Sequence, residues 1–128
     1  MDNSVSSPAR KKILVVDDNP DIRRLLRLSL EDPYEILEAE DGPSALALVR
    51  QHLPGLVILD IMMPGAIDGL QVLERIKQTP ELQHILVIML TARGQSRDFQ
   101  FGMQKGADAY FVKPFSPLVL LQWISSRI

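Results

Sequence analysis

The stretch Leu56-Val57-Ile58-Leu59-Asp60 is a run of four aliphatic residues that ends in a carboxylate. Pro54-Gly55 precedes it and Pro64-Gly65 follows it closely. A short apolar run between such breakers predicts a fully buried strand. If the neighbouring strands are parallel and joined by helices, Asp60 lies at the carboxyl edge of a sheet, where open α/β sheets place their ligands.

Predicted strands and helices alternate along the whole chain. Further strands are predicted at residues 12–16, 34–39, 85–90 and 109–112. Apolar residues at helical spacing predict helices between them, at about residues 20–31, 45–52, 70–78, 95–105 and 117–128. The central strands are apolar throughout, which calls for a parallel sheet covered by helices on both faces. With right-handed crossovers, this is an α/β, doubly wound sandwich of five strand–helix units.

Composition limits the classes of function. The chain has 128 residues, a net charge of -2 and no cysteine, which argues against direct nucleic-acid binding and excludes disulfides and thiol chemistry. No apolar run approaches the ~20 residues of a membrane span, and the polar first residues do not resemble a signal peptide. We expect a soluble cytoplasmic protein with no membrane partner, with a flexible tail at 1–11 and one domain at 12–128.

Charged and hydroxyl side chains end four of the predicted strands. Asp17 and Asp18 follow the first strand, Asp60 ends the third, Thr91 follows the fourth and Lys113 the fifth. Because the carboxyl ends of parallel strands meet at one edge of the sheet, we expect these side chains to converge. The three arginines of the helix at 20–31 (Arg23, Arg24 and Arg27) are expected to form a solvated face, with contact to a kinase partner as the alternative.

Three converging carboxylates repel one another unless a cation lies among them. An all-oxygen ligand set favours Mg²⁺ first and Mn²⁺ second. A carboxylate that binds a metal beside a lysine and a threonine can accept a phosphoryl group. In this prediction Asp60 attacks, the metal and Lys113 neutralise charge, and Thr91 donates a hydrogen bond to the product.

Five short segments occur in a fixed order at these strand ends. They are ILVVDD at 13–18, DIMMP at 60–64, DG at 68–69, LTA at 90–92 and GADAYFVKPF at 106–115. With them, residues 12 to about 128 resemble the receiver domain of two-component response regulators. The resemblance implies a flavodoxin-like fold with strand order 2-1-3-4-5. It also implies a signalling switch that receives its phosphoryl group from a sensor histidine kinase or a histidine phosphotransfer protein.

The resemblance also implies roles for single residues. Asp60 would be the phosphoacceptor. Asp18 would bind Mg²⁺ directly and Asp17 largely through water, with the backbone carbonyl of Met62 as a further ligand. Phosphotransfer and dephosphorylation would both be self-catalysed, so the chain would not be an enzyme in the ordinary sense.

Three further features follow from the same resemblance. Thr91 would move toward the phosphoryl group and Tyr110 would change rotamer, and the Lys113–Pro114 peptide bond would be cis. The chain departs from the family pattern after Asp60, where residues 65–67 carry one extra residue. This insertion leaves the conformation of the following loop open.

Two other functions would use similar residues. A phosphatase or phosphotransferase of the haloacid dehalogenase type also uses an Asp nucleophile, Mg²⁺, Thr and Lys. Such enzymes carry a D-x-D pattern after the first strand, whereas Asp17 and Asp18 are adjacent here. A degenerate receiver that acts as a constitutive binding module is the other alternative, and the presence of all five key side chains argues against it.

Apolar residues in the C-terminal third exceed what the core needs. Leu120, Leu121 and Ile124 suffice as the core stripe of the last helix, which leaves Val119 and Trp123 pointing elsewhere. Phe101 likewise falls off the apolar face of the helix at 95–105. Either this helix, the strand at 109–112 and the last helix form an output surface for a partner or homodimer, or Trp123 folds back over a neighbouring helix.

Overall fold

The computed structural model describes residues 10–63, 65–92 and 103–128. In chain order, the labelled elements are β1 (Lys12–Val16), α2 (Pro20–Leu30), β2 (Glu35–Ala39), α3 (Gly42–His52), β3 (Leu56–Asp60), α4 (Gly69–Gln78), β4 (Leu86–Ala92), β5 (Ala109–Lys113) and α6 (Pro117–Ser125). Within these residues, no helix has the length and apolar content needed to cross a bilayer.

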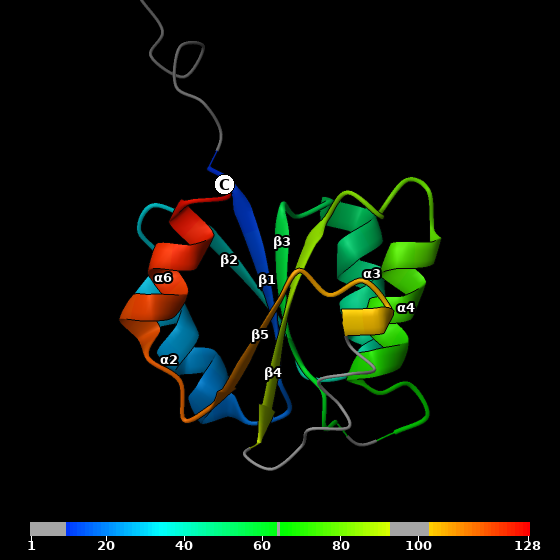
Figure 1. Cartoon of the computed structure of the whole chain (residues 1–128), viewed down its shortest axis with the longest axis horizontal. Helices are drawn as coiled ribbons and strands as arrows, with labels where there is room; N and C mark the ends of the chain where they lie inside the picture. Colours follow the sequence, from blue (N-terminus) through cyan, green and yellow to red (C-terminus); the bar gives the residue numbers. More distant parts are fainter. Residues whose placement is uncertain (1–9, 64, 93–102) are drawn as a thin grey trace, which may run out of the picture.

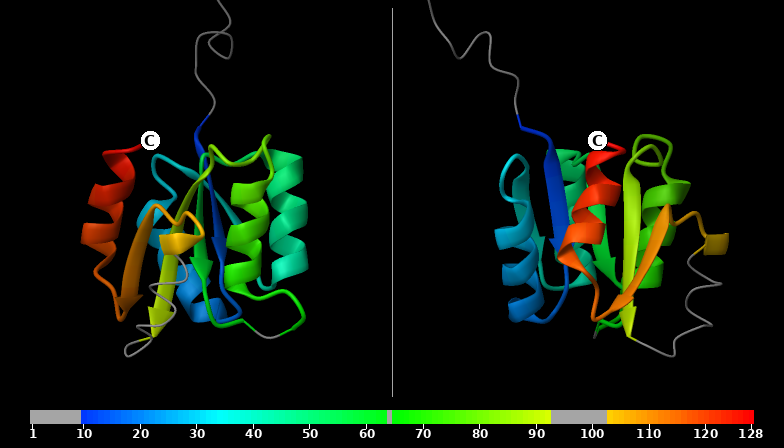
Figure 2. Two further views of the ribbon diagram at one scale, coloured as in Figure 1. Left: turned by 45° about the vertical axis from the view of Figure 1, so that its right-hand side comes forward. Right: turned by 60° about the vertical axis from the view of Figure 1, so that its left-hand side comes forward.

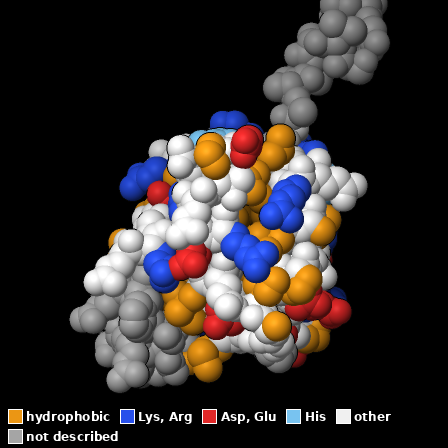
Figure 3. Space-filling model, turned by 90° about the vertical axis from the view of Figure 1, so that its right-hand side faces the viewer, with side chains coloured by type: hydrophobic (Ala, Val, Ile, Leu, Met, Phe, Trp, Pro, Cys, Tyr) orange, Lys and Arg blue, Asp and Glu red, His pale blue; other side chains and the backbone are white. Residues whose placement is uncertain are grey.

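The strands form one five-stranded sheet with the order β2-β1-β3-β4-β5. Every pairing between neighbours is parallel. Helices α3 and α4 lie against one face of the sheet, and α2 and α6 lie against the other (Figures 1 and 2). The predicted doubly wound fold and strand order are therefore confirmed. Seen from the α3–α4 side, basic, acidic and apolar side chains are interspersed over the surface (Figure 3).

The central strands contribute side chains to both faces of the sheet. In β3, Val57 and Leu59 join the apolar cluster under α3 and α4, whereas Leu56 and Ile58 join the cluster under α2 and α6. All four are fully buried. This is why β3 is an unbroken apolar run: a strand covered on both faces has no position for a polar side chain.

Helix starts follow the capping signals in the sequence. Asn19 caps α2 by accepting a hydrogen bond from the amide of Asp21 at 2.9 Å, and Pro20 takes the first helical position. Ser116 caps α6 in the same way, by accepting from the amide of Val119 at 3.2 Å. These caps place the loop after β1 and the start of α6 at the carboxyl edge of the sheet.

Some predicted boundaries differ from the structure. Strand β4 begins at Leu86 and extends through Ala92, because Thr91 and Ala92 still pair with β5. Helix α6 ends at Ser125, with the next residue as its cap, instead of continuing to Ile128. The predicted helix at 95–105 lies mostly outside the described residues, as do residues 1–9 of the predicted tail. Arg10, also assigned to that tail, donates a hydrogen bond to the carbonyl oxygen of Glu31 at 3.1 Å.

Candidate functional site

The structure brings three carboxylates together at the carboxyl edge of the sheet. Asp17 and Asp18 follow β1, and Asp60 is the last residue of β3. One carboxylate oxygen from each lies within 4.8 Å of the others. Asp17 and Asp60 are buried, whereas Asp18 is exposed. The cluster is therefore closed by protein on the side of the sheet and open to solvent at Asp18.

Lys113 reaches this cluster from the end of β5. Its ammonium nitrogen lies 2.9 Å from Oδ2 of Asp17 and 3.6 Å from Oδ2 of Asp60. The Lys113–Pro114 peptide bond is cis. A lysine between two buried carboxylates offsets part of their repulsion, and it lies where it can also contact an oxygen bound to Asp60.

Thr91 and Tyr110 occupy neighbouring strands beside the cluster. Thr91 is fully buried in β4, and its hydroxyl donates a 3.4 Å hydrogen bond to the carbonyl oxygen of Ala92. Tyr110 in β5 is half-buried and packs against the apolar cluster under α3 and α4. Both side chains lie on the β4–β5 side of Asp60, since β4 separates β3 from β5.

Backbone amides fix the two buried carboxylates. Oδ1 of Asp17 accepts a hydrogen bond from the amide of Asn19 at 2.9 Å, and Oδ1 of Asp60 accepts one from the amide of Met62 at 3.1 Å. Each carboxylate thus keeps one oxygen bound to the loop that follows its strand. The second oxygen of each faces Lys113.

The surroundings of Asp60 make its ionisation costly. Burial raises the pKa of Asp60 to about 6, and the carboxylates of Asp17 and Asp18 also raise it. The ammonium group of Lys113 and the amide of Met62 act in the opposite direction but do not outweigh burial. The site is therefore short of positive charge near Asp60.

The donor set fits a hard divalent cation. It consists of carboxylate oxygens, two of them fixed by backbone amides, with Asp18 exposed on the solvent side. A cation among these oxygens would relieve the repulsion that raises the pKa of Asp60. The cluster can therefore bind a metal ion.

The loop with the extra residue packs closely beside the site. Gly65 has a φ of 105°, which favours glycine, and Pro64 lies outside the described residues. A Cβ atom added at Gly42 would lie 2.4 Å from the carbonyl oxygen of Ile67. The loop thus approaches the start of α3 so closely that glycine is required there. No motif in the sequence predicts this contact.

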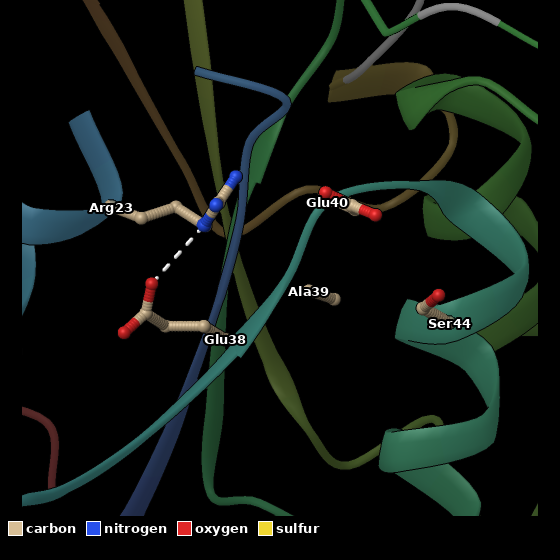
Figure 4. A pocket seen from close by; sticks show the side chains of 5 residues that line it. All are labelled: Arg23, Glu38, Ala39, Glu40 and Ser44. Carbon is tan, nitrogen blue, oxygen red and sulfur yellow. Dashed lines mark hydrogen bonds and ion pairs between the residues drawn. The ribbon is translucent and has the colours of Figure 1, made fainter. Parts of the chain in front are cut away.

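The expectation that the arginines of α2 form a solvated face is wrong for Arg23. Its guanidinium donates a hydrogen bond from Nη1 to the backbone carbonyl oxygen of Asp17 at 2.6 Å and pairs through Nε with Glu38 at 3.1 Å. Figure 4 shows this pair beside a pocket also lined by Glu40 and Ser44. Helical spacing alone did not distinguish Arg23 from its neighbours, because the contact depends on where β2 lies.

Comparison with known proteins agrees with the fold and identifies the family. The family model of the response regulator receiver domain matches residues 13–125. Response regulator GtcR of Aneurinibacillus migulanus is 42% identical over 119 residues, which are 92% of this chain and 48% of that protein. Transcriptional regulatory protein ResD of Bacillus subtilis is 48% identical over 107 residues, 83% of this chain and 43% of that protein. The chain thus spans less than half the length of these relatives.

Solved structures show the same similarity. A putative response regulator from Chloroflexus aurantiacus superposes with a TM-score of 0.86 at 33% identity, covering 92% of this chain and 97% of the other. Chemotaxis protein CheY4 of Vibrio cholerae superposes with a TM-score of 0.85 at 30% identity, covering 94% of this chain and 100% of the other. The chain belongs to the response regulator receiver domain family of two-component systems.

Gly69 provides a test of how the backbone of Asp60 is placed. A Cβ atom at this position would lie 2.1 Å from the carbonyl oxygen of Asp60 and 2.7 Å from Cα of Ile61. We predict that Gly69→Ala lowers the free energy of unfolding by about 2–4 kcal/mol, because β3 and α4 must separate. Gly55→Ala is the control, since its nearest neighbour lies at 3.9 Å. Urea unfolding measures both variants. If they lose similar amounts of unfolding free energy, the close contact at Gly69 is contradicted.

The raised pKa of Asp60 predicts a pH-dependent effect on stability. A carboxyl group whose pKa rises from 3.8 to about 6 on folding holds its proton more tightly in the folded state. The free energy of unfolding therefore falls as the pH rises through this window. We predict that Asp60→Asn, without divalent cations, is more stable than the native chain by roughly 1–3 kcal/mol near pH 7.5.

The difference between Asp60→Asn and the native chain should disappear below about pH 4, where both side chains are uncharged. Urea unfolding at both pH values measures it. Glu81→Gln, at an exposed position, is the control that removes a carboxylate elsewhere. If Asp60→Asn keeps the same gain in unfolding free energy at the lower pH, repulsion at Asp60 is not the cause of that gain.

Proposed function

We propose that this chain is a phosphorylation-dependent switch in which Asp60 accepts a phosphoryl group from a histidine kinase or a histidine phosphotransfer protein. The observation that carries the proposal is the position of the Asp60 carboxylate. It is buried at the sheet edge with Lys113 at 3.6 Å and two further carboxylates close by. Family membership supports the same reading.

The chain's own residues would carry out the transfer. An oxygen of Asp60 forms a bond to phosphorus while the bond from phosphorus to the donor's nitrogen breaks. Lys113 neutralises charge on the phosphoryl oxygens. When bound, Mg²⁺ (or Mn²⁺) would supply further positive charge, held by Asp17, Asp18, Asp60 and the backbone carbonyl of Met62. The same groups would assist hydrolysis of the acyl phosphate by water.

The response to phosphorylation would begin at Thr91 and Tyr110. A phosphoryl group adds a charge of about -1.5 to -2, which a nearby hydroxyl can stabilise by donating a hydrogen bond. Thr91 would turn toward the phosphoryl group, and Tyr110 on the neighbouring strand would change rotamer. The added charge would thereby reweight two packings of one fold.

Intact mass spectrometry tests the acceptor. Incubation with a small acyl phosphate donor and Mg²⁺ should add one phosphoryl group to the native chain, and chelation of the metal should prevent labelling. Asp60→Asn should not be labelled, whereas Glu81→Gln should be labelled like the native chain. Equal labelling of Asp60→Asn would contradict the proposal. Repeated turnover of phosphomonoesters would instead indicate a phosphatase.

The output surface would lie on β5 and α6, together with the segment at 95–105. Val112, Leu118 and Val119 are exposed apolar residues on the described part of this surface. Phe101 lies outside the described residues. Trp123 is half-buried against the core and its ring lies 4.7 Å from the guanidinium of Arg127, so it contributes less free surface than its sequence position suggests.

Light scattering with and without a phosphoryl mimic tests whether this surface forms a homodimer. We expect the native chain with the mimic to dimerise and Val119→Arg to remain monomeric, because a buried unpaired charge is costly. Leu28→Arg, an exposed apolar position on α2, is the matched control and should dimerise. A native monomer in both states would contradict the homodimer.

Transcriptional regulators among the relatives suggest that the output of the whole protein is transcriptional.

A further inference from the structure

Arg23 connects the acidic cluster to the edge strand of the sheet. Nη1 donates to the backbone carbonyl oxygen of Asp17 at 2.6 Å, and Nε pairs with Oε1 of Glu38 on β2 at 3.1 Å. The side chain is only 16% exposed. A rigid guanidinium with one partner just after β1 and another on β2 has a fixed orientation.

Glu38 is held in turn by a second arginine. Its other oxygen lies 2.6 Å from Nε of Arg27, whose Nη2 donates to the carbonyl oxygen of Ile36 at 3.2 Å. Burial raises the pKa of Glu38, but the hydrogen bonds and charges of Arg27 and Arg23 outweigh it and hold the pKa below its usual value. The charged carboxylate thus lies between two arginines one helical turn apart, which would otherwise repel each other.

The contact from Arg23 completes the hold on Asp17. The amide of Asp17 donates to the carbonyl oxygen of Ala39 at 3.1 Å. The carboxylate of Asp17 accepts hydrogen bonds from the amide of Asn19 and from the ammonium group of Lys113. The carbonyl bound by Arg23 belongs to the peptide group that joins Asp17 to Asp18. Rotation of this group would reorient Asp17 and Asp18 together.

We propose that Arg23 is a positioning residue for cation binding by Asp17 and Asp18, and that Glu38 holds Arg23 in place. This inference depends on the proposed function for the divalent cation at the cluster. Arg23 would act through the peptide between the two carboxylates. Its charge alone would weaken the binding of a cation nearby. Position and charge therefore predict opposite effects when Arg23 is removed.

Titration with Mg²⁺, followed by the amide NMR signals of the loop after β1, separates the two effects. We expect Arg23→Met to weaken Mg²⁺ binding by about tenfold, as loss of an outer support does at other metal sites. The matched control is Arg24→Met, which removes the same charge from the next residue. Arg24 is exposed and has no hydrogen bond or ion pair within the described residues. Unchanged or tighter binding by Arg23→Met would overturn the inference.

Two variants at Glu38 test the support of Arg23 itself. Glu38→Gln keeps an oxygen that can accept from Nε of Arg23, so most of the Mg²⁺ affinity should remain. Glu38→Ala removes that acceptor and should weaken binding about as much as Arg23→Met does. Native-like spectra outside the loop establish that each variant is folded. Equal affinities of both Glu38 variants and the native chain would exclude this supporting role.

Phosphorylation by a small acyl phosphate donor gives the second readout. For Arg23→Met, the half-saturating Mg²⁺ concentration should rise about tenfold, while the rate at saturating Mg²⁺ changes less than about twofold. If neither the native chain nor any variant is labelled, but Arg23→Met binds Mg²⁺ more weakly than the native chain, the proposed function fails and the positioning role stands. If the native chain is labelled and Arg23→Met binds Mg²⁺ as tightly as the native chain does, only the positioning role fails.

Discussion

Three carboxylates crowd the carboxyl edge of the sheet, and their repulsion governs the structure around them. Lys113 crosses from β5 to contact two of them, and backbone amides bind one oxygen each of Asp17 and Asp60. Even so, burial and the neighbouring charges leave the pKa of Asp60 at about 6. This arrangement lowers the free energy of unfolding near neutral pH, and a cation among the carboxylates would relieve the repulsion.

The sequence predicts this convergence because the signals for it are local. Proline and glycine bound the apolar run of β3, and a strand without polar positions must be covered on both faces. Once the sheet is parallel, the ends of its strands meet at one edge. This places Asp17, Asp60 and Lys113 together without any knowledge of loop conformations. The capping residues Asn19 and Ser116 could be predicted for the same reason.

Contacts that depend on how one element lies over another could not be predicted in this way. Helical spacing shows that Arg23 and Arg27 lie away from the apolar stripe of α2, but not that Glu38 on the edge strand reaches both. The same limit applies to Gly69, whose need for glycine comes from the carbonyl of Asp60, nine residues earlier. These contacts are set by the packing of a helix against a strand, which no periodicity in the sequence records.

The two sides of the site differ in how firmly their groups are held. On the β1 side, Asp17 has a partner for its amide, its carbonyl and both carboxylate oxygens. On the β4 side, the buried hydroxyl of Thr91 has a long hydrogen bond of 3.4 Å to the carbonyl of the next residue. A buried hydroxyl with a weak partner is stabilised when it donates to a stronger acceptor. New charge on Asp60 would therefore move Thr91 sooner than Asp17, which directs the proposed response toward β5 and α6.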